Sequence, residues 1–174
     1  MEISAFVNAI RPGLVRQHKF NVIFTFPTLA GTSNDARDAT ILARTATLPS
    51  STLGVIPVMY AGREIPVPGD RTYEEFTVNF YATNAWNIRD SFERWSESIN
   101  GSESNTGTVL FDDFMRDIQL DLLDSNDAVR KTYVLKDAWP INVGAADMDQ
   151  GSQDSVVEFP VTFRYINVQS NTTR

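Results

Sequence analysis

Cysteine is absent from the chain and histidine occurs once, as His18. Without cysteine, neither a disulfide framework nor a thiolate metal site can form. A histidine-dependent catalytic triad would have to be built on His18, whose neighbours show no nucleophile turn. We therefore interpret His18 as a surface residue or one that leads into a strand.

Long apolar runs are also absent. No segment approaches the roughly 20 apolar residues that a membrane span requires. The first residues lack the basic flank and apolar stretch of a signal peptide. We expect a soluble protein that makes no contact with a membrane.

Basic residues are few relative to acidic ones. The 15 lysines and arginines face 22 aspartates and glutamates, which gives a net charge of −7. Tight nucleic-acid binding depends on cationic side chains that displace counterions from phosphates. The charge balance therefore disfavours adhesion to DNA, although it does not exclude proximity to it.

The acidic residues do not form a recognisable catalytic or metal-binding pattern. The run at residues 147–154 lacks the alternating oxygens and closing glutamate of a calcium loop. Asp112 and Asp113 are adjacent, so their side chains diverge on a strand or a helix and form a poor acid/base pair. We expect no catalytic residues, no metal site and no cofactor. A hydrolase with a carboxylate pair and a monomeric ligand-binding β-barrel stay open as alternatives.

Alternating apolar and polar residues predict several two-faced strands. They cover residues 17–26, 72–81, 118–122, 129–136 and 157–165. Ile88, Phe92, Trp95 and Ile99 recur at helical spacing and predict one helix with an apolar stripe. Residues 28–38 have the polar composition of a loop, and residues 39–48 are ambiguous between helix and strand.

This pattern predicts a mostly β protein, or α+β by a lenient count. The architecture expected is a small antiparallel β-barrel or sandwich with one flanking α-helix. Residues 1–174 are expected to form one domain with flexible termini and an extended loop around residues 49–71. Pro66 and Pro68 keep that loop extended and Gly69 permits a turn, so the charges of Arg63, Glu64, Asp70 and Arg71 lie on a stiff segment.

Residues 62–80, together with Asn87-Ile88-Arg89-Asp90-Ser91-Phe92-Glu93-Arg94-Trp95, resemble the tail tube proteins of contractile-tailed, T4-like bacteriophages. The resemblance implies a structural subunit that forms hexameric rings, which stack into the inner tube of the virion tail. It implies sheath, baseplate and tape-measure proteins as partners, DNA in transit without specific binding, and assembly in the cytoplasm of the host bacterium. A tube subunit of a pyocin-like or type VI secretion particle is the nearest alternative.

Two sets of residues follow as candidates for this function. Arg63, Glu64, Asp70 and Arg71 are expected to form contacts between subunits. Polar residues opposite the apolar faces of the strands are expected to line the bore or the outer wall; these candidates are Glu75, Thr77, Asn79, Gln119, Asp121, Glu158 and Thr162.

Overall fold

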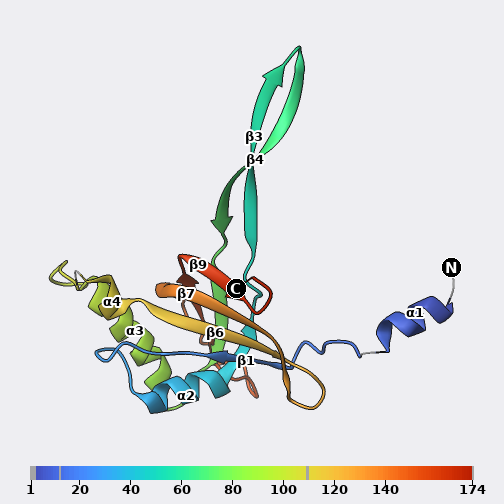
Figure 1. The fold of residues 1–174 in the computed structure, drawn as a ribbon. Helices are drawn as coiled ribbons and strands as arrows, with labels where there is room; N and C mark the ends of the chain where they lie inside the picture. Colours follow the sequence, from blue (N-terminus) through green and yellow to red (C-terminus); the bar gives the residue numbers. More distant parts are fainter. Residues whose placement is uncertain (1–2, 12, 109, 174) are drawn as a thin grey trace.

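The computed structural model describes residues 3–11, 13–108 and 110–173 and consists mainly of antiparallel strands (Figure 1). In chain order the elements are α1 (Ile3–Ile10), β1 (Phe20–Ile23), α2 (Ser33–Leu42), β2 (Ala43–Ala46), β3 (Ser51–Tyr60), β4 (Arg63–Tyr73), β5 (Phe76–Tyr81), α3 (Asn87–Ile99), α4 (Phe111–Phe114), β6 (Arg116–Leu123), β7 (Val129–Val143), β8 (Glu158–Arg164) and β9 (Asn167–Ser170). Seven strands form one sheet, in which β1-β6-β7-β8-β5-β2 are successive neighbours and β9 pairs with β7. β3 and β4 form a separate two-stranded sheet.

The core lies between one face of the large sheet and helices α2 and α3. Phe76, Val78 and Phe80 alternate with half-buried residues along β5 and are fully buried. They belong to one buried cluster with Phe92 and Trp95 of α3. The predicted mostly-β, antiparallel class is confirmed, whereas no closed barrel is assigned. That residues 1–174 form a single domain with flexible termini stays a prediction.

Strand β7 joins the two parts of the large sheet. Its first part pairs with β6 and β9, and its last residues pair with β8. Asp137 lies between these parts with φ 55°, a left-handed conformation that aspartate tolerates better than most residues. The register against β6 shifts at the same place, so this residue marks an irregularity in the strand.

The predicted helix is confirmed as α3. Its stripe residues Ile88, Phe92 and Trp95 are buried. The ring of Phe92 contacts Phe26 edge-on, with 5.0 Å between ring centroids. The indole N–H of Trp95 donates to the backbone carbonyl of Phe114 at 2.7 Å, which satisfies its donor inside the core.

The prediction of a loop over residues 28–38 is wrong, because α2 begins at Ser33 within it. The Asp35 backbone N–H donates to the Thr32 hydroxyl at 3.4 Å, and the Asp35 carboxylate accepts from the Thr32 backbone N–H at 2.8 Å. This reciprocal capping starts the helix. The polar residues that resembled a loop are the exposed first turn of a capped helix.

We expect Asp35→Asn to lower the free energy of unfolding by about 1 kcal/mol at pH 7, through the weakened cap. The Thr32 backbone hydrogen bond lowers the pKa of the Asp35 carboxyl below its ordinary value of 3.8. A lowered folded-state pKa stabilises the protein above the unfolded value and loses that contribution as pH falls through the folded one. Urea unfolding of both proteins should therefore show a difference that shrinks below pH 3.8. A difference that is constant with pH would contradict this role.

The prediction of an extended loop around residues 49–71 is also wrong. This segment contains the antiparallel strands β3 and β4, whose hairpin projects far from the large sheet (Figure 1). At another side of the molecule, α1 lies at the end of an extended arm and buries no residue.

Candidate assembly site

The β3–β4 hairpin closes through a two-residue turn. Tyr60 pairs with Arg63, and the two residues between them, Ala61 and Gly62, have φ values of 49° and 78°. Two successive residues with positive φ define a type I′ turn, whose twist matches that of the flanking strands. The turn therefore fixes the register of the hairpin.

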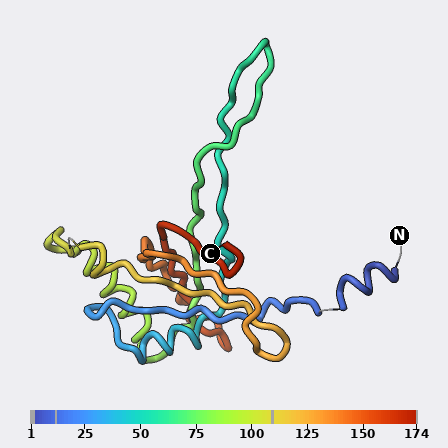
Figure 2. The backbone as a smooth tube through the Cα atoms, viewed as in Figure 1, coloured from blue at the N-terminus to red at the C-terminus, as the bar shows by residue number. Residues whose placement is uncertain are grey.

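A pair of glycines divides the hairpin into a base and a tip. The register shifts between Leu53 and Val55, around Gly54. A Cβ on Gly69 would lie 3.2 Å from the backbone carbonyl of Gly54, which is a very close approach. Figure 2 shows the two strands crossing part of the way along the hairpin. We call residues 55–60 and 63–68 the distal hairpin.

The distal hairpin exposes a group of large apolar side chains to solvent. Every residue of β3 is exposed. The exposed large apolar residues are Val55, Ile56, Val58, Met59, Tyr60, Ile65 and Val67, with exposed fractions of 40–72%. An isolated two-stranded hairpin is marginally stable in water, and contiguous exposed apolar surface marks interaction sites. This hairpin therefore has the properties of a docking element.

The four predicted interface charges all lie on β4. Among the described residues, none of the four makes an ion pair within the chain. Arg71 donates instead to the Ser51 hydroxyl at 2.9 Å. Residues 51–73 carry two arginines and two acids, so the hairpin is neutral and the whole net charge of −7 belongs to the rest of the chain.

The base of the hairpin is anchored to the large sheet by tyrosines. The Tyr73 hydroxyl donates to the side-chain oxygen of Asn167 at 2.9 Å, and its ring lies 5.8 Å from that of Tyr165 between centroids. Burial raises the pKa of the Tyr165 hydroxyl, which has no hydrogen-bond partner within the described part of the chain. The hairpin is thus fixed at its base and free along its length.

Most of the predicted bore residues lie together on the face of the large sheet opposite the core. Thr77 and Thr162 are cross-strand partners on β5 and β8, with 3.1 Å between their hydroxyl oxygens. The others on this face form pairs: Asn79 donates to Thr45 at 2.8 Å, Glu75 lies 3.6 Å from Arg164, and Glu158 pairs with Arg44. The sequence correctly predicts one polar surface on these strands.

Gln119 and Asp121 lie instead on β6. Asp121 is 6% exposed, and its carboxylate accepts from the Thr132 hydroxyl at 2.6 Å and from the Gln119 amide at 2.9 and 3.0 Å. The pairing of β6 with β7 brings Thr132 opposite Asp121. Its side chain is therefore buried in the subunit and is not available on the surface.

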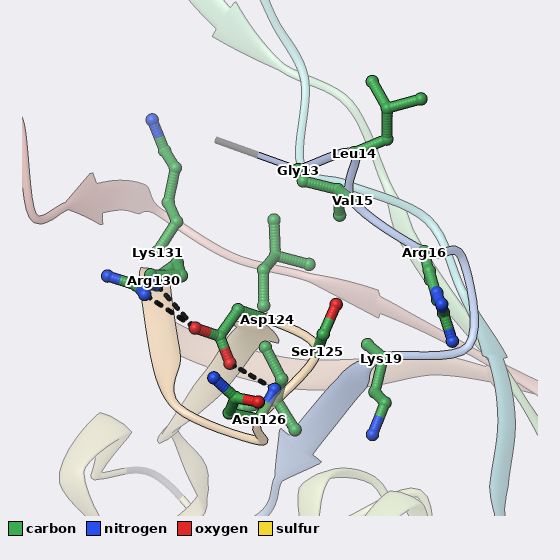
Figure 3. A pocket seen from close by; sticks show the side chains of 12 residues that line it. Gly13, Leu14, Val15, Arg16, Lys19, Asp124, Ser125, Asn126, Arg130 and Lys131 are labelled. Carbon is green, nitrogen blue, oxygen red and sulfur yellow. Dashed lines mark hydrogen bonds and ion pairs between the residues drawn. The ribbon is translucent and has the colours of Figure 1, made fainter. Parts of the chain in front are cut away.

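A hollow of about 560 Å³ lies between the arm before β1 and the turn joining β6 to β7 (Figure 3). Asp124 lies on its wall and is paired with Arg130 at 2.7 Å. The backbone N–H of Ala128 is the main cause that lowers the pKa of this carboxyl, so it is held as an ionised turn residue. The described lining of this hollow includes one acid, Asp124, and no histidine.

Other candidate chemistry is also dispersed. His18 is exposed and precedes β1 by two residues, as predicted for a surface position. Asp112 and Asp113 are exposed in the short helix α4. Within the described ranges no three acidic or histidine side chains are arranged to hold a metal ion. No helix in the same ranges is long and apolar enough to cross a membrane.

Sequence reasoning missed the apolar hairpin as a functional surface. The signal was present in the alternation of Ile56, Val58 and Tyr60 followed by Ala61-Gly62 and then Ile65. A two-residue, glycine-containing segment between two alternating runs is compatible with a hairpin turn. The prolines and charges in this segment led instead to the prediction of a loop.

Solved structures of low sequence identity share this fold. A chain in the cryo-EM structure of the anti-feeding prophage baseplate, six-fold symmetrised, matches with a TM-score of 0.67 at 18% identity, over 91% of this chain and 95% of that one. A chain of an extracellular contractile injection system, the PVC sheath-tube complex in the extended state, matches with a TM-score of 0.63 at 15% identity over 98% of both chains.

Sequence comparison is more specific. The family model described as phage tail tube protein matches residues 15–170. The tail tube protein of Serratia phage KSP90 is 40% identical over 162 residues, covering 93% of this chain and 92% of the relative. Tail tube protein gp19 of Enterobacteria phage T4 is 30% identical over 133 residues, covering 71% and 76%. The chain therefore belongs to the phage tail tube protein family, as a structural tube subunit of the tail of a T4-like virion.

Proposed function

We propose that this subunit assembles into stacked hexameric rings that form a hollow tube, and that it has no catalytic role. The observation that carries the proposal is the distal hairpin, whose large apolar side chains are 40–72% exposed in the subunit. A structure holding a chain of the same fold is six-fold symmetrised, which supports the ring number. The polar face of β5 and β8 supports a wall exposed to an aqueous channel.

The proposed partners follow from where similar chains are found. Chains of this fold occur in a baseplate, in a tube-terminating cap and in a sheath-tube complex. We propose that this tube likewise starts on a baseplate and lies inside a contractile sheath. A tape-measure protein during assembly, and DNA in transit afterwards, are the proposed contents of the bore.

The direct test is negative-stain microscopy and sedimentation of the full chain over a wide concentration range, with and without phage baseplates. Hollow tubes that pellet are the expected result. A monomeric ligand-binding barrel would stay near 19.5 kDa at every concentration. Monomers under all conditions, including in the presence of baseplates, would refute the proposal.

We predict that Arg63→Ala or Asp70→Ala raises the concentration needed for assembly and leaves the melting temperature of the subunit unchanged. Removing one member of a desolvated interfacial ion pair costs about 2–5 kcal/mol, whereas an exposed pair contributes about 0.2–1 kcal/mol. Pelleting assays and thermal denaturation measure the two quantities. Arg63→Lys is the matched control, because it keeps the charge. Normal assembly of both alanine variants would show that these charges do not lie at the interface between subunits.

We predict that Thr162→Lys slows DNA ejection from assembled particles, most strongly at low salt. Duplex DNA carries about one negative charge per 1.7 Å, and added cations on the bore wall would hold it. In a hexamer this substitution adds six positive charges to each ring. Thr162→Gln is the control, because it adds length without charge. Ejection at the parental rate by assembled Thr162→Lys particles would show that β8 does not line the bore.

A further inference from the structure

The prolines of the distal hairpin occupy specific ladder positions. Pro57 lies directly opposite Pro66, and Pro68 lies opposite Val55. In an antiparallel ladder, pairs of residues alternate between those that exchange two hydrogen bonds and those that exchange none. Neither Pro57 nor Pro66 has an N–H, so their pair is of the second kind. The pairs Val55–Pro68 and Met59–Glu64, two residues away on either side, are of this kind too.

Residues in the pairs that exchange no hydrogen bonds point their backbone N–H groups outward, along the edges of the hairpin. Proline removes three of these six outward positions, two of them on the β4 edge. Only Val55, Met59 and Glu64 keep an outward donor on the distal hairpin. Edge prolines are a recognised way to prevent the addition of another strand. Because the inward donors are intact, the prolines block the edges without weakening the hairpin.

The side chains of the hydrogen-bonded pairs share one face. Ile56 lies opposite Val67, Val58 opposite Ile65, and Tyr60 opposite Arg63. We call the set Ile56, Val58, Tyr60, Ile65 and Val67 the apolar hairpin face. All five side chains are at least 40% exposed. The opposite face carries Val55, Met59, Glu64 and the three prolines. It exposes two large apolar side chains and the apolar hairpin face exposes five, so the apolar hairpin face has more to gain from burial.

We propose that the distal hairpin binds a second copy of this chain through the apolar hairpin face, and that its prolines prevent it from joining that copy by strand addition. The inference rests on the proposed assembly into tubes. Charge favours a second copy as the partner, because the hairpin is neutral and the rest of each chain carries −7. A neutral apolar element can approach an acidic body without the repulsion that two bodies exert on each other.

Hydrogen exchange on assembled tubes tests the mode of contact directly. The outward amides of Met59 and Glu64 are the probes, and the inward amides of Val58 and Ile65 are the internal reference. If docking is through the face, the two outward amides stay at least about tenfold less protected than the reference amides. Protection of the outward amides equal to that of the reference amides would show strand addition and overturn the proposal.

Matched variants test the face independently. Ile65→Asp places a charge on the apolar hairpin face and should raise the critical concentration for assembly at least about tenfold, because a buried unpaired charge is costly. Met59→Asp places the same charge on the opposite face and should leave that concentration within about threefold of the parent. Equal effects of the two variants, in either direction, would overturn the assignment of the face. Failure of the parent chain to form tubes would instead refute the proposed function.

Glu64→Pro removes one of the outward donors that remain, and circular dichroism would check that the subunit stays folded. We expect tubes at a concentration within about threefold of that of the Glu64→Gln variant, because docking through the face does not use this donor. Loss of assembly by the folded variant would overturn the proposal. Charge is controlled by Glu64→Gln, which removes the carboxylate and keeps the N–H.

Discussion

Trp95→Ala is expected to lower the free energy of unfolding of the isolated subunit by about 3–5 kcal/mol, as is typical for the loss of a large buried aromatic side chain. Trp95 has no exposed surface and lies in the aromatic cluster between α3 and the large sheet. Its ring contacts Phe26 edge-on at 5.7 Å between centroids, and it also lies 6.2 Å from Phe163. The substitution leaves a cavity and also removes the hydrogen-bond donor of the Phe114 backbone carbonyl.

Urea unfolding of the unassembled subunit measures this change. In a protein of this size, 1 kcal/mol corresponds to a shift of about 2–4 °C, so the melting temperature should fall by about 6–20 °C. Trp95→Phe is the control, because it keeps an aromatic ring but removes the indole donor, and its loss should be smaller. A decrease below about 1 kcal/mol for the alanine variant would show that this cluster does not dominate the core.

Replacing residues 56–67 with a four-residue Gly-Ser linker should abolish tube assembly and leave the subunit folded. The removed residues are exposed and lie outside the buried cluster that stabilises the subunit. Their loss therefore removes the proposed docking surface without opening a cavity. We expect no pelletable tubes up to at least about a hundredfold above the parental critical concentration, a change of about 2.8 kcal/mol per added subunit.

Sedimentation, microscopy and thermal denaturation of the shortened chain measure both effects. Ala61→Asn is the matched control: it keeps the hairpin and provides the Asn-Gly pair that a type I′ turn prefers, so its tubes should form normally. Normal tubes from the shortened chain would exclude the distal hairpin as the docking element. A large fall in melting temperature would show instead that the hairpin contributes to the fold of the subunit.

Local patterns predicted the elements that pack within the subunit. The alternation of Phe76, Val78 and Phe80 correctly identified the buried face of β5, and the spacing of Phe92 and Trp95 identified α3. Both succeed because a strand or helix repeats its faces at a fixed interval, so that burial on one side is visible in a short window. The resemblance to the tail tube family was likewise carried by a short stretch of sequence and is confirmed by the family match.

Pairing between segments that are distant in the sequence determined the features that local patterns did not predict. The β3–β4 hairpin resembled a loop because prolines interrupt its strands, and only the register shows that they occupy positions whose N–H groups would point outward. Asp121 resembled an exposed polar residue until β7 placed Thr132 opposite it and enclosed its carboxylate. Sequence alone thus determined which residues face the core and the family to which the chain belongs. The tertiary structure determined which remaining surfaces are available for contact, because availability depends on neighbours that are distant in the chain.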